Sequence, residues 1–135
     1  MNIFNSLTPI IDPNFNLSIT LDDNINKIID ESIDGDSCNN YDIAKIFHYI
    51  YKDFYKYDDI NDKWFINING NWIYEHYSFN IKIPIYIGHL YKLRKNISND
   101  PIVIKKLKRY IDHLKNRDFR LDIITECKEV FIYNN

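Results

Sequence analysis

Residues 42–55 read DIAKIFHYIYKDFY and predict a buried amphipathic helix. Their apolar side chains recur at the i, i+3, i+4 and i+7 spacing of a single helix face. The stripe consists of Ile43, Ile46, Phe47, Ile50, Tyr51 and Phe54. Asn39 and Asn40 are suitable N-cap residues, and the carboxylate of Asp42 complements the positive end of the helix dipole.

A tight β-hairpin is predicted next, after the polar run 57–62. Residues 63–68 (KWFINI) and 72–74 (WIY) flank Asn69-Gly70, and Asn-Gly favours a two-residue turn in which both residues have positive φ. Trp64 and Trp72 could form a cross-strand pair. We interpret both tryptophans as core or hairpin packing rather than as base-stacking groups, and the same interpretation applies to Phe47, Phe54 and Phe65.

The segments around this centre have weaker signals. Residues 1–20 predict an irregular arm, and residues 22–31 a short helix that buries Ile25, Ile28 and Ile29, with Asp22 or Asp23 near its cap. Ile81, Ile83, Ile85 and Ile87 alternate with other residues, which predicts a third strand. Pro84 lacks an N–H donor, so we place this strand at a sheet edge.

The C-terminal part predicts three helices. The first covers 89–97, with Leu90, Leu93 and Ile97 facing inward. The second begins after the Asx cap and proline of Asp100-Pro101 and runs to about residue 115. The third covers about 119–131. The expected fold class is therefore α+β. We expect one small domain at 41–135, with an amphipathic helix, a hairpin extended to about three strands and two to three helices, preceded by an acidic, partly irregular N-terminal arm at 1–40.

Composition and charge limit the class of protein. With 135 residues, 45% of them hydrophobic, the chain can form one domain with a substantial core. Residues 1–40 carry one lysine against seven acidic residues, whereas residues 81–135 carry twelve basic against six acidic residues. Cys38 and Cys127 are isolated, and neither a signal peptide nor a long apolar run is visible. We expect reduced thiols and a soluble, intracellular protein that is not secreted and has no membrane partner.

The basic residues of the second half are the candidate binding site. Two adjacent predicted helices carry Lys92, Arg94, Lys95, Lys105, Lys106, Lys108 and Arg109, with Asp100 the only acidic residue between them. Such a face can bind nucleic-acid phosphates, and Tyr91 and Tyr110 could supply stacking surfaces for unpaired bases. The alternative is an ordinary solvated helix face, and the acidic arm could also lie across these residues and mask them.

No catalytic pattern is present. His48, His76, His89 and His113 lack the spacing of metal ligands, and neither a nucleophilic triad nor a carboxylate pair with a catalytic setting can be identified. We expect no metal, no cofactor and no enzymatic activity.

Four motifs in order resemble a known family. They are IAKIF with Tyr51-Lys52 (43–52), DKWF followed by Asn69-Gly70 and Trp72 (62–72), LYKLRKNIS (90–98) and IITECKEVF (123–131). Together they resemble the segment that precedes the superfamily 3 helicase in the primase-helicases of large DNA viruses, phages and plasmids. The resemblance covers residues 41–131.

The chain departs from this family in several places. Only Asn71 separates the Asn-Gly turn from Trp72, where the family has a basic residue. The stretch 75–89 is longer than the usual connection, and no phosphate-binding G-x-x-x-x-G-K-[ST] motif is present. The resemblance therefore implies a helicase-adjacent module without the ATPase.

Two hypotheses follow, and they assign the chain to different classes of protein. In the first, the chain is a non-enzymatic DNA-replication accessory module of a virus or mobile element, located in the host cytoplasm or at a viral replication site. It binds DNA, or a helicase or primase protein, through the basic helices. In the second, it is a structural or interaction protein of a DNA virus that associates, also with its own copies, through the sheet edge at 81–87.

Overall fold

A computed structural model describes residues 22–75 and 86–133. These residues form an α+β domain with five helices and one three-stranded antiparallel sheet, as the sequence predicts. The elements are α2 (Asp23–Ser32), α3 (Asn40–Tyr51), β1 (Tyr55–Asp58), β2 (Lys63–Ile68), β3 (Asn71–Glu75), α5 (Gly88–Ile97), α6 (Pro101–Leu114) and α7 (Arg117–Tyr133).

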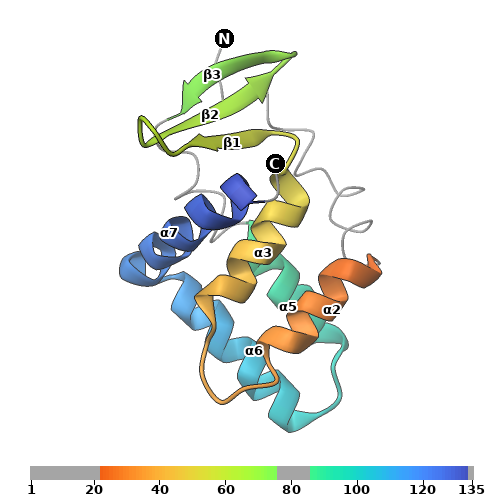
Figure 1. The fold of residues 1–135 in the computed structure, drawn as a ribbon. Helices are drawn as coiled ribbons and strands as arrows, with labels where there is room; N and C mark the ends of the chain where they lie inside the picture. Colours follow the sequence, from red (N-terminus) through yellow and green to blue (C-terminus); the bar gives the residue numbers. More distant parts are fainter. Residues whose placement is uncertain (1–21, 76–85, 134–135) are drawn as a thin grey trace.

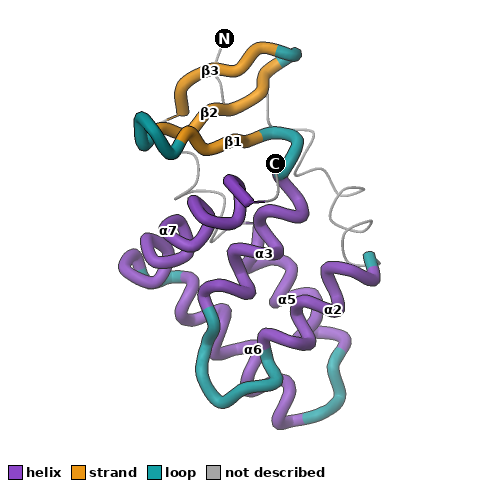
Figure 2. The backbone as a smooth tube through the Cα atoms, viewed as in Figure 1, coloured by secondary structure: helices purple, strands orange, loops and turns teal. Residues whose placement is uncertain are grey.

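The helices form one body, and the sheet lies at one end of it (Figure 1). Helix α3 passes through the middle and packs against both α2 and α7, while α5 packs against α6. Strand β1 lies nearest the helices and contacts α7, and β3 lies farthest from them (Figures 1 and 2).

Helix α3 confirms the central prediction but is shorter than expected. Asn39 is the N-cap, and its side chain accepts hydrogen bonds from the backbone N–H groups of Tyr41 and Asp42. The helix ends at Tyr51, so Phe54 does not belong to its buried face and is 37% exposed. The backbone N–H of Phe54 donates to the carbonyl of Tyr51 over 2.9 Å and closes the turn that leads into β1.

The hairpin between β2 and β3 has the predicted turn. Asn69 and Gly70 have φ values of 53° and 86°, as a two-residue turn with two left-handed residues requires. The register places Trp72 opposite Asn67 and Trp64 opposite Glu75. The prediction that Trp64 and Trp72 form a cross-strand pair is therefore wrong, because their rings lie on opposite faces of the sheet.

The third strand comes from a different segment than predicted. It is β1, which pairs with β2 in the register Tyr55 to Ile66 and Asp58 to Lys63. Tyr55 and Tyr57 point to the same face two residues apart, so this segment has the period of a strand. Of the predicted strand at 81–87, residues 81–85 lie outside the described part. Tyr86 and Ile87 form a helical turn that leads into α5.

Helix α2 belongs to the same core as the rest of the domain. Asp22 caps it by accepting hydrogen bonds from Asn24 N and Ile25 N at 2.8 and 3.2 Å, which confirms the predicted cap. Ile25, Ile29 and Ile33 are buried in the core.

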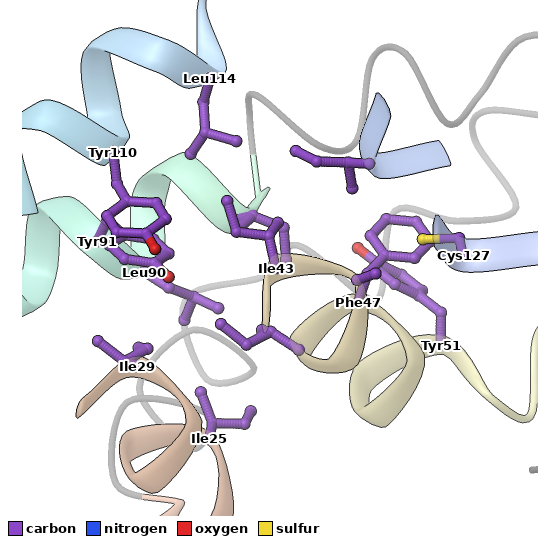
Figure 3. Close-up of a cluster of buried hydrophobic side chains, with 14 of the residues drawn as sticks. Ile25, Ile29, Ile43, Phe47, Tyr51, Leu90, Tyr91, Tyr110, Leu114 and Cys127 are labelled. Atoms are coloured by element: carbon purple, nitrogen blue, oxygen red, sulfur yellow. The ribbon is translucent and has the colours of Figure 1, made fainter. Parts of the chain in front are cut away.

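The hydrophobic core is centred on α3 and receives side chains from every helix (Figure 3). The centroid of the Phe47 ring lies 4.5 Å from that of Tyr51 and 6.3 Å from that of Phe131. The ring of Trp64 meets Phe131 edge-on at 5.2 Å, so β2 and α7 share this core. The buried hydrophobic residues are Ile25, Ile29, Ile33, Ile43, Ala44, Ile46, Phe47, Tyr51, Tyr55, Trp64, Ile66, Ile87, Leu90, Tyr91, Leu107, Tyr110, Ile111, Leu114, Ile123, Cys127, Val130 and Phe131.

The C-terminal helices largely follow the prediction. Asp100 caps α6 through its contact with Ile102 N at 2.9 Å, and Pro101 is the first helical residue. Ile97 differs from the prediction that it faces inward: it is the last residue of α5 and is 68% exposed.

The turn between β1 and β2 is attached to α7 by a polar contact. Lys128 of α7 donates to the Asp62 carboxylate over 3.1 Å, and the hydroxyl of Tyr57 donates to the same oxygen. These hydrogen bonds hold the pKa of Asp62 below its ordinary value, with the bond from Tyr57 the larger cause. The same bond raises the pKa of Tyr57 to about 12. We call these three residues the Asp62 latch.

Candidate nucleic-acid interface

The seven predicted basic residues lie on α5 and α6, but they are not equivalent. Lys92, Lys105 and Lys108 are exposed, whereas the other four are partly buried. The two arginines contact α2 and the loop that follows it. The five lysines have different surroundings.

Arg94 of α5 is bound to α2. Its guanidinium donates to the side-chain oxygen of Asn26 over 2.9 Å and forms an ion pair with Asp30. The Arg94 side chain is only 17% exposed. Arg94 thus joins α5 to α2 and has little surface left for a phosphate.

Arg109 of α6 contacts the loop between α2 and α3. Its Nη1 donates to the backbone carbonyl of Asp36. The guanidinium also lies near Cys38, where its positive charge partly offsets the effect of burial; burial still raises the pKa of the Cys38 thiol to about 11. Arg109 therefore holds the loop between α2 and α3 against α6.

The lysines of the candidate site form no ion pair with another described residue. Within 22–75 and 86–133, no carboxylate lies within 4.0 Å of Lys92, Lys95, Lys105, Lys106 or Lys108. Two of the three acidic residues of α2 pair with other groups: Asp30 with Arg94, and Glu31 with Lys45 at 3.6 Å. Five cations on two helices in contact are therefore available to anions.

The two tyrosines proposed as stacking surfaces are not accessible. Tyr91 and Tyr110 are 0% and 2% exposed, and their rings stack on each other at 4.9 Å with an interplanar angle of 17° (Figure 3). The prediction that they receive bases is wrong, because both aromatic rings fill the core between α5, α6 and the end of α2.

An aromatic surface that the sequence prediction missed lies on the sheet. Phe65, Trp72 and Tyr74 share the face opposite to buried Trp64 and Ile66, and Lys56 and Lys63 share it with them. The sequence contained the necessary signal: a two-residue turn at 69–70 sets Trp72 opposite Asn67, so strict alternation separates it from Trp64.

The other candidate chemistry forms no site in the described residues. The structure brings together no group of three or more His, Cys, Asp or Glu side chains there that could hold a metal ion. Both cysteines are free thiols, and burial raises the pKa of Cys127 far above its ordinary value. Among the helices of 22–75 and 86–133, none has the length and apolar character needed to cross a membrane.

Comparisons of the chain with protein-family models, with curated proteins and with solved structures find no match. The resemblance to the helicase-adjacent segment therefore stays a prediction. The sheet edge of the assembly hypothesis, around Pro84, lies outside the described residues.

Proposed function

We propose that this chain is a non-enzymatic DNA-binding accessory module of viral or mobile-element DNA replication, and that it contacts DNA phosphates through the lysines of α5 and α6. One observation carries the proposal. Lys92, Lys105 and Lys108 are exposed on two helices in contact, and no carboxylate among the described residues pairs with them.

Unpaired lysines favour phosphate binding for a simple electrostatic reason. An ammonium group that already has a carboxylate partner must give it up before it binds a phosphate, whereas an unpaired one only releases counterions. Asp100 lies between the two helices, but its carboxylate is hydrogen-bonded to the N-terminus of α6. These contacts carry no base-specific information, so the proposed binding is independent of sequence.

The link to replication rests on the resemblance of residues 41–131 to the segment before a superfamily 3 helicase. It makes a helicase or primase protein the candidate protein partner and a replication site inside the cell the candidate location. Association with further copies of the chain is compatible with this role.

The test is fluorescence anisotropy of a labelled single-stranded oligonucleotide titrated with the full chain at several salt concentrations. We expect affinity to fall steeply with salt. The double substitution Lys105→Gln/Lys108→Gln should weaken binding and reduce the slope of log affinity against log salt by about one per lost phosphate contact.

Lys27→Gln provides the matched control, because Lys27 is an exposed lysine on the acidic helix α2. It should leave the salt slope unchanged. If the chain does not bind at low salt, or if the double variant binds like the wild type, α5 and α6 do not form the interface.

A further inference from the structure

The sheet has one face that neither α3 nor α7 covers. We call it the outer sheet face. Its residues are Lys56, Asp58, Lys63, Phe65, Asn67, Trp72 and Tyr74, and the strand registers place them on one side. Lys56, Phe65 and Tyr74 form one row across the three strands, and Trp72 lies two residues from Tyr74 on β3.

The aromatic rings on this face are accessible. Trp72 and Tyr74 are 40% and 43% exposed, and the Phe65 ring meets Tyr74 edge-on at 6.3 Å. Neighbouring exposed aromatic side chains on one sheet face are unusual for a surface that contacts only water, and they typically mark a binding site.

Each exposed ring has a lysine beside it. The Nζ atom of Lys56 lies 4.5 Å from the centroid of the Trp72 ring, and that of Lys63 lies 5.4 Å from the centroid of Tyr74. Lysine side chains are long and flexible. Each ammonium group can therefore turn toward a phosphate, and that of Lys56 then leaves the face of the Trp72 ring to a planar ligand group.

The acidic groups near this face do not oppose an anion strongly. Asp58 is the only acidic residue on it among the described residues. Its carboxylate accepts hydrogen bonds from Ile60 N at 3.0 Å and from the Asn61 side chain at 2.7 Å. Glu75 is buried and lies on the other face, opposite Trp64.

Rings with adjacent cations fit one class of ligand. Single-stranded nucleic acid presents flat bases for stacking and phosphates for the lysines, whereas a duplex keeps the faces of its bases inside the stack. Residues two apart on a β-strand, such as Trp72 and Tyr74, are separated by about 7 Å. This is about twice the distance between stacked neighbouring bases of a nucleic-acid strand. Bases on Trp72 and Tyr74 would therefore be splayed apart, as unpaired bases can be.

The geometry points to the outer sheet face as a binding site for the unpaired bases of single-stranded nucleic acid, with Trp72 and Tyr74 as stacking groups and Lys56 and Lys63 as phosphate contacts. This site shares its class of ligand with the function proposed above. It uses none of the lysines of α5 and α6, so either site can fail alone.

The experiment measures binding of the full chain to oligo(dT), to a duplex of equal length and to inorganic polyphosphate, which has charge but no bases. Stacking of one base typically contributes about 5- to 150-fold in affinity. Trp72→Ala and Tyr74→Ala should each weaken oligo(dT) binding by at least about fivefold and leave polyphosphate binding unchanged. Oligo(dT) should also quench tryptophan fluorescence in the wild type but not in Trp72→Phe.

Ile73→Ala is the matched control, because Ile73 lies between the two aromatic residues on β3, is 43% exposed and faces the other side. It should bind oligo(dT) like the wild type, and circular dichroism should show all variants folded. The inference is overturned if Trp72→Ala and Tyr74→Ala bind oligo(dT) like Ile73→Ala. If the two aromatic variants bind normally and only Lys105→Gln/Lys108→Gln loses oligo(dT) binding, then α5 and α6 form the binding site and the outer sheet face does not.

Discussion

Ser32 connects two tyrosines that come from two other helices. Its Oγ donates to the carbonyl of Ile29 at 2.7 Å, so the Tyr91 hydroxyl, 2.8 Å away, donates to Oγ. The Tyr110 hydroxyl donates to the Ser32 carbonyl at 2.6 Å and accepts from the backbone N–H of Asn39 at 2.7 Å. Burial raises the pKa of both tyrosines, which keeps them protonated as donors.

Removal of one of these hydroxyls should destabilise the fold without changing its shape. Tyr110→Phe keeps the stacked ring but leaves the Ser32 carbonyl and the Asn39 N–H unpaired, at a cost of about 1–3 kcal/mol. Urea unfolding measures this loss. Tyr41→Phe, at an exposed position on α3, should change the unfolding free energy by less than about 0.5 kcal/mol; an equal loss in both variants would contradict the role of the Tyr110 hydroxyl.

The sequence predicted the helical positions of these tyrosines but not their partners. Tyr110 lies at helical spacing with Leu107, Ile111 and Leu114, yet it is predicted, like Tyr91, to offer a surface ring to unpaired bases. The hydroxyl partner of Tyr91, Ser32, is 59 residues away in the chain. Such a contact depends on how helices pack, which local spacing does not encode.

At the scale of elements, the turn at 69–70 was predictable because its chemistry is local. Gly70 has φ +86°, a conformation that L side chains rarely adopt. Strand β1 was missed for the opposite reason. The apolar stripe of α3 runs on to Phe54 in the sequence, and neither glycine nor proline marks the helix end at Tyr51. Only pairing with β2 makes Tyr55–Asp58 a strand.

Gly70→Ala should therefore weaken the hairpin. No atom lies within 4 Å of the added Cβ position, so the cost comes from backbone strain alone, about 1–2 kcal/mol. Gly88→Ala is the control: its added Cβ also meets no atom within 4 Å, and Gly88 begins helix α5 at a φ that alanine adopts easily. We expect Gly88→Ala to be neutral or stabilising in thermal unfolding. Equal destabilisation of both variants would contradict the strained turn.

At the scale of the whole molecule, the Asp62 latch attaches the sheet to the helical body. The folded state lowers the pKa of Asp62, so the latch stabilises the fold fully above the unfolded pKa of about 3.9. This stabilisation is lost as the pH falls through the lower, folded value. The latch therefore acts at neutral pH and disappears in acid.

Asp62→Asn tests this pH dependence. Asparagine tolerates the left-handed φ of 51° at position 62, so the backbone stays unstrained and only the charge is removed. The difference in melting temperature between wild type and variant should be clear at neutral pH and shrink as the pH falls from about 3.9 through the lower, folded pKa of Asp62. The pKa of Tyr57 should also fall from about 12 toward its ordinary value, as tyrosine NMR titration can measure. Asp59→Asn, in the same turn, should leave the melting temperature unchanged and lower the pKa of Tyr57 much less than Asp62→Asn does, because the charge of Asp59 is only a minor cause of that shift.

The packing of α3 against α7 also determines when the chain can fold during its synthesis. Phe47 and Phe131 lie in one core with their centroids 6.3 Å apart, although more than eighty residues separate them in the sequence. A nascent chain on the ribosome holds the apolar face of α3 without its partner until α7 has emerged. Because contacts of long sequence separation form late, we expect the core to close only after α7 has left the ribosome, with the apolar stripe of α3 uncovered until then.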